Sequence, residues 1–77
     1  MKDVKEIKNT IIRIIAEYLD KDEAEVASDA TFSDIGLDSL DIMELTMQIE
    51  EELDTKVELS QEITTIDKLA ELIANAD

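Results

Sequence analysis

The sequence contains no cysteine and no histidine. Without a thiol it forms no disulfide and offers no thiolate nucleophile or thiolate metal ligand. Without an imidazole it has no Ser–His catalytic pair, and a zinc site would consist of oxygen ligands alone, which is unusual. We therefore expect neither an enzyme nor a metal centre, although the stretch Gly36-Leu37-Asp38-Ser39-Leu40 superficially resembles a hydrolase motif.

Proline is also absent, and aromatic residues make up 3% of the chain, so a core has to be filled by aliphatic side chains. Apolar residues recur at helical spacing over residues 3–19, 39–53 and 65–75. The segment 20–38 is interpreted as a long connection, and residues 58–63 have the length of one short helical turn. A chain of 77 residues with this pattern predicts one domain, residues 1–77, folded as an all-α bundle of three to four helices.

The first and last predicted helices each have an apolar stripe that is expected to face the core. The stripes are Val4, Ile7, Ile11, Ile14, Ile15 and Tyr18 in the first helix, and Ile66, Leu69, Ala70, Leu72 and Ile73 in the last.

Basic residues are scarce: 7 Lys and Arg stand against 21 Asp and Glu, which gives a formal net charge of −14 at pH 7. This charge repels nucleic-acid phosphates and anionic membranes, and it favours basic protein surfaces as partners. The sequence shows no signal peptide and no apolar run long enough to span a membrane. We expect a monomeric, cytoplasmic protein that binds neither nucleic acid nor membranes.

The predicted helix over residues 39–53 carries two apolar strips and no basic residue. The expected core strip is Ile42, Leu45, Ile49 and Leu53, and the second strip is Leu40, Met43 and Met47. The second strip is either additional core, because methionine fills irregular gaps, or a surface that meets partners. Glutamates at positions 50–52 oppose the helix dipole, where stability alone would favour lysine. Because features that oppose stability are expected at functional sites, we interpret this segment as an acidic docking helix.

Ser39 stands where a loop is expected to become this helix. Asp38 is predicted to be the N-cap, and Asp41 three residues later completes an acidic variant of the capping box. Ser39 then occupies the first helical position with its hydroxyl free, where N–H groups and the helix dipole favour a phosphate. Since the chain offers no obvious catalytic base, the role that remains for this serine is that of a modification site.

Two other interpretations explain the acidic composition. A calcium-binding loop that starts at Asp20 is rejected, because Glu25 stands where such a loop requires glycine and Thr31 where it requires the closing glutamate. An unmodified acidic interaction module, such as an inhibitor or a scaffold, stays open as the alternative. It explains the charge but gives Ser39 no role.

The stretch IGLDSLDIMELTMQIEEEL, residues 35–53, resembles the attachment motif of acyl carrier proteins. The amphipathic first segment, the long loop and the sequence ITT before the last helix extend the similarity over nearly the whole chain. The resemblance implies that Ser39 carries 4′-phosphopantetheine, added from coenzyme A by a separate phosphopantetheinyl transferase. It also implies a non-catalytic carrier that holds acyl chains as thioesters and delivers them to enzymes of fatty-acid, polyketide or specialised lipid biosynthesis.

The same resemblance assigns two sets of residues around Ser39. The set expected to meet basic patches of partner enzymes is Asp38, Leu40, Asp41, Met43, Glu44, Met47, Glu50 and Glu51. The set expected to line a cleft for the acyl chain is Phe32, Ile35, Leu45, Ile49, Ile63, Ile66 and Leu69. Residues 56–59 stand where the usual fatty-acid carrier has an Ile-Pro pair, which leaves the cargo and the pathway open.

Overall fold

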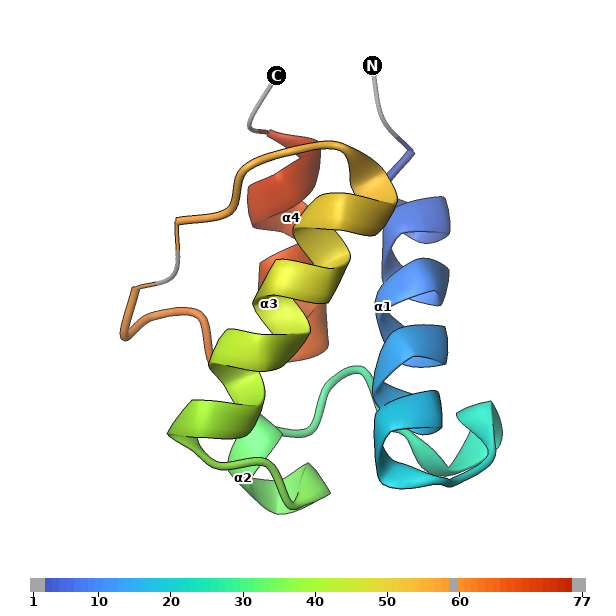
Figure 1. The fold of residues 1–77 in the computed structure, drawn as a ribbon. Coiled ribbons are helices and arrows are strands. Elements are labelled where there is room, and N and C mark those ends of the chain that lie inside the picture. The colour runs from blue at the N-terminus through green and yellow to red at the C-terminus, as the bar shows by residue number, and fades with distance from the viewer. Residues whose placement is uncertain (1–2, 59, 76–77) are drawn as a thin grey trace.

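The structure is a computed structural model that describes residues 3–58 and 60–75. Its elements are α1 (Val4–Leu19), the 3₁₀ turn η1 (Glu23–Glu25), α2 (Phe32–Ile35), α3 (Ser39–Leu53) and α4 (Ile66–Ala74). Helix α1 runs antiparallel to α3 and α4 and packs against both, and α2 lies at the end of the bundle where α3 begins (Figure 1). The regular elements among the described residues are all helices, without a β-strand, which confirms the predicted all-α fold.

The three long helices lie within about one residue of their predicted bounds because the sequence supplies a cap at each start. The side chains of Asp3, Asp38 and Thr65 each accept a hydrogen bond from a backbone N–H in the first turn of the helix that follows. At the other ends, Asp20 and Asp54 adopt left-handed backbone conformations, with φ of 57° and 49°, and their N–H groups donate to carbonyls of the last turn.

The core is aliphatic, as the composition predicts. The most deeply buried large side chains are Ile11 and Ile15 of α1, Ile49 of α3, and Ile66 and Ile73 of α4. Each comes from a stripe at helical spacing, so the three helices bury one face each against the others.

Two residues of the predicted α1 stripe lie at the surface instead. Val4 is 40% exposed because it opens the helix, one turn before the first buried residue, Ile7. Tyr18 is 36% exposed because its ring lies at the last turn of α1, where its hydroxyl contacts the carboxylates of Asp41 and Glu44 in α3. A phenol carries a polar tip that favours such a partner over an apolar core.

Polar contacts join α4 to the rest of the fold. The Asp67 N–H donates to the Ser28 carbonyl over 3.1 Å, and the Asp67 carboxylate pairs with the Lys8 ammonium over 2.8 Å. The Lys8 ammonium holds the pKa of Asp67 below its ordinary value, because it favours the ionised carboxylate.

The connection over residues 20–38 contains more structure than the sequence predicts. The apolar side chains of Val26, Phe32 and Leu37 are buried and fix it to the core. The Phe32 N–H donates to the carbonyl of Thr64 over 2.9 Å, which holds α2 against the start of α4. Gly36 then ends α2 with φ of 105°, a backbone conformation that side chains other than glycine rarely adopt, and turns the chain into α3.

The short helical turn predicted over residues 58–63 does not form a helix among the described residues of this segment, and position 59 lies outside them. A single hydrogen bond from the Ile63 N–H to the Ser60 carbonyl, 3.1 Å long, closes a turn instead. Ile63 packs partly against the core, whereas Gln61 and Glu62 are exposed. Among the described residues of this segment only Ile63 packs against the core, which gives a helix little tertiary support. The fourth helix is α2, earlier in the chain.

Candidate functional site

Ser39 is the first residue of α3 and is exposed. The predicted capping box is confirmed. The Asp41 N–H donates to Asp38 Oδ1 over 2.9 Å, and the Asp38 N–H donates to Asp41 Oδ2 over 3.1 Å. Because Asp38 supplies the cap, the Ser39 hydroxyl is not used for it, and among the described residues the structure records no hydrogen bond from this hydroxyl. The hydroxyl is therefore available at the surface.

The local field at Ser39 suits a negatively charged substituent. Ser39 lies at the positive end of α3, a helix of 15 residues. Unpaired N–H groups and aligned peptide dipoles at such an end stabilise an anion. A phosphate esterified to this hydroxyl would therefore lie in a favourable position.

A hollow of about 560 Å³ opens to solvent beside Ser39. Apolar side chains of Phe32, Leu37, Ile42 and Ile63 contribute to its wall, together with polar atoms of the α2 and α3 starts. Two of the predicted cleft residues, Phe32 and Ile63, are thus next to the serine.

The second apolar strip of α3 lies at the surface. Leu40 is 73% exposed, Met43 61% and Met47 64%, so these side chains are not additional core. Their exposure supports the alternative interpretation, a surface that meets partners. Glu44 and Glu51 are exposed on the same helix, which gives the strip an acidic border.

Tyr18 is the site residue that the sequence did not reveal. Its hydroxyl donates to Asp41 Oδ1 over 2.5 Å and lies 3.1 Å from Glu44 Oε2, and so links the last turn of α1 to the first turns of α3. The hydrogen bond to Asp41, then loss of solvent, then the contact with Glu44 raise the pKa of Tyr18 above its ordinary value. The same hydrogen bond, followed by that from the Asp38 N–H, lowers the pKa of Asp41. The apolar spacing of Tyr18 in the sequence pointed to the core, and nothing in it indicated this contact.

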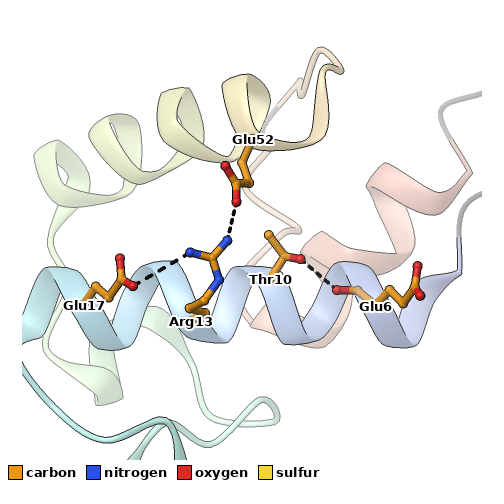
Figure 2. Close-up of polar contacts among 5 residues, drawn as sticks. All are labelled: Glu6, Thr10, Arg13, Glu17 and Glu52. Carbon is orange, nitrogen blue, oxygen red and sulfur yellow. Dashed lines mark hydrogen bonds and ion pairs between the residues drawn. The ribbon is translucent and has the colours of Figure 1, made fainter.

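The carboxylates at the end of α3 also differ from one another. Glu50 is partly buried, and its Oε2 accepts a hydrogen bond of 2.8 Å from the Val57 N–H. Glu52 pairs with Arg13 of α1, as Figure 2 shows, and the same guanidinium lies 3.8 Å from Glu17. A cation from α1 therefore offsets part of the negative charge that the dipole disfavours at this end.

The family model of the phosphopantetheine attachment site matches residues 9–73. The chain belongs to this family. It is a carrier domain for covalently attached 4′-phosphopantetheine and not an enzyme, because domains of this family carry the group without catalysing a reaction. Carrier domains interact with the transferases that load them and with synthesising enzymes. The predicted carrier class and cofactor are confirmed.

The residues of this carrier domain fit the group that the family carries. An exposed hydroxyl lies at a helix N-terminus, and the neighbouring hollow offers space for the part of the arm that follows the phosphate. The net charge of −14 is also compatible with basic enzyme surfaces. Across residues 3–58 and 60–75, no helix of the carrier domain combines the length and apolarity that crossing a membrane requires.

The interior of the carrier domain is closely packed around the other predicted cleft residues. Phe32, Leu45, Ile49 and Leu69 border an internal void of about 10 Å³, which is about the space of one water molecule. Ile35 is partly buried and Ile66 fully buried, and both lie outside this void and the hollow beside Ser39. The role of the seven residues in holding an acyl chain stays a prediction.

Proposed function

We propose that Ser39 carries the phosphopantetheine arm and that residues 1–77 act as a single, monomeric carrier of acyl groups in the cytoplasm. The observation that carries the proposal is the exposed Ser39 hydroxyl at the start of α3, next to a cap that does not use it. The bound arm supplies a terminal thiol for a thioester, a group that this chain lacks. The chain has no histidine, the residue that most often acts as a general base, so we propose that the base that removes the Ser39 proton during loading comes from the transferase.

We further propose that α3 is the docking surface for the enzymes that load, extend and accept the acyl group. The exposed strip of Leu40, Met43 and Met47 supplies apolar contact area. The carboxylates proposed to attract a basic patch are those of Asp38, Asp41, Glu44, Glu50 and Glu51. Electrostatic attraction of this kind speeds encounter and leaves binding weak enough for release, which suits a shuttle between enzymes of fatty-acid, polyketide or specialised lipid biosynthesis.

For the acyl chain we propose an entry from the hollow beside Ser39. Phe32, Leu37 and Ile42 border both this hollow and the internal void, so a path between them passes these three side chains. The void is too small for an acyl chain as it stands, so holding one requires the side chains or helices around it to move apart. Leu45, Ile49 and Leu69 would then line the inner part of the cleft.

Intact mass spectrometry after incubation of the apo protein with coenzyme A and a broad-specificity phosphopantetheinyl transferase tests the attachment. Ser33→Ala is the matched control, because Ser33 is an exposed serine that borders the same hollow. We expect one phosphopantetheine on the parent protein and on Ser33→Ala, and none on Ser39→Ala. Far-ultraviolet circular dichroism checks that each variant is folded. A folded parent protein that gains no mass would contradict the proposal and favour the unmodified acidic interaction module.

A further inference from the structure

One phenol hydroxyl meets two carboxylates at the start of α3. Tyr18 Oη lies 2.5 Å from Asp41 Oδ1 and 3.1 Å from Glu44 Oε2. A phenol has a single proton to donate, so the shorter contact, to Asp41, is the main hydrogen bond. These two carboxylates lie three residues apart on α3 and have the same charge, yet their environments differ.

Both carboxylate oxygens of Asp41 already accept a hydrogen bond within the fold. Oδ1 accepts from the Tyr18 hydroxyl, and Oδ2 accepts from the Asp38 N–H over 3.1 Å. The residue is also partly buried. A carboxylate oxygen can accept two hydrogen bonds, so a basic side chain of a partner can still reach Asp41. It would, however, pair with a carboxylate whose negative charge is already shared with the Tyr18 hydroxyl and the Asp38 N–H.

Glu44 is in a different position. It is exposed, and its contact with the Tyr18 hydroxyl involves Oε2, the longer of the two contacts. Its second oxygen takes no part in that contact, and Glu44 borders a surface hollow that Met47 and Glu51 also line. A lysine or arginine of a partner can therefore pair with Glu44 while the Tyr18 contact stays intact.

We propose that Tyr18 is a positioning residue for partner docking: its hydrogen bond weakens the direct pairing of Asp41 with a basic partner and leaves Glu44 as the stronger pairing site. The inference rests on the proposed docking role of α3. It assigns different roles to Asp41 and Glu44, to which the family resemblance gives the same role.

The kinetics of phosphopantetheine transfer provide the test, with the apo protein as substrate and a broad-specificity transferase as the basic partner. Asp41→Asn and Glu44→Gln each remove one negative charge, so they are matched to one another. Asn keeps an oxygen that accepts from the Asp38 N–H, which preserves the cap. Tyr18→Phe keeps the ring and removes the hydroxyl.

We expect Glu44→Gln to raise KM by about fivefold in the parent protein, and Asp41→Asn by less than about twofold. In the Tyr18→Phe background, where Asp41 Oδ1 is released, we expect Asp41→Asn to raise KM by about fivefold. Values of kcat should stay unchanged, because the substitutions alter docking and leave Ser39 intact.

Three results would overturn the role of Tyr18. These are an equal effect of Asp41→Asn in both backgrounds, equal effects of Asp41→Asn and Glu44→Gln in the parent protein, and a change of kcat instead of KM. Failure of the parent protein to accept the arm is a separate result, seen by mass alone, and would overturn the proposed function itself. Thermal unfolding of each variant, followed by circular dichroism, shows that all are folded at the assay temperature.

Discussion

Replacing Met47 by alanine removes apolar surface from the proposed docking face without touching the core. Met47 is 64% exposed and lies about two helical turns beyond Ser39, so the attachment chemistry is left alone. Alanine has the highest helix propensity, so α3 itself should not weaken. The substitution therefore isolates the apolar part of docking.

The structure sets the size of the effect. Full burial of a methionine side chain is worth about 1.5–3 kcal/mol. Since 64% of Met47 is available to a partner, complete coverage on docking contributes about 1–2 kcal/mol. A free-energy change of about 1.4 kcal/mol corresponds to a tenfold change in affinity. Loss of this contact is therefore expected to raise KM for the transferase by about 5- to 30-fold.

The assay is steady-state transfer of phosphopantetheine at varied concentrations of apo protein, with Val4→Ala as the control. Val4 is also an exposed apolar residue, 40% accessible, but it lies on α1. We expect KM to rise for Met47→Ala alone, with kcat unchanged. A change below about twofold for Met47→Ala, or an equal change for Val4→Ala, would refute the argument that the exposed strip is a docking surface.

Two further predictions concern the contacts between α1 and α3. Arg13→Gln removes the pairing with Glu52, and for such an exposed ion pair we expect a loss of about 0.2–1 kcal/mol, seen as a fall in Tm of about 1–8 °C at low salt that shrinks in high salt. Lys21→Gln, which removes a charge outside this cluster, should change Tm less, and an equal fall would show that net charge alone is responsible. Tyr18 is the only tyrosine and the chain has no tryptophan, so ultraviolet absorbance follows its ionisation without interference. Its pKa is raised in the fold, so the stabilisation from its hydrogen bonds is complete below about pH 10 and is lost as pH rises through the folded-state pKa. We expect a titration midpoint above about 10 in the folded protein and a lower one in Asp41→Asn; an ordinary midpoint in the folded parent protein would count against the contact.

The positions of the long helices followed from the sequence because the information that sets them is local. A capping residue precedes each helix, and the apolar stripes repeat at the helical period. The capping box of Asp38 and Asp41 needs only their spacing of three residues. The availability of the Ser39 hydroxyl follows from it, so the centre of the site was predictable.

Two of the predictions that differed from the structure concern segments whose conformation depends on distant residues. Helix α2 has one turn of its own and is held by the hydrogen bond from Phe32 to Thr64, some thirty residues away in the chain. The segment 58–63 also contains two apolar residues, yet its described residues 60–63 form a turn. Local sequence does not distinguish these two cases.

The sequence by itself determined the helical fold class, the bounds of the long helices, the free serine at the start of α3 and the acidic character of that helix, because capping, periodicity and charge are properties of neighbouring residues. Only the tertiary structure decided which side chains the carboxylates of α3 contact. The contacts of Tyr18 with Asp41 and Glu44, and of Arg13 with Glu52, join residues 23 to 39 positions apart. Pairs this distant meet only when α1 packs against α3, so the sequence pattern of either helix does not predict these contacts.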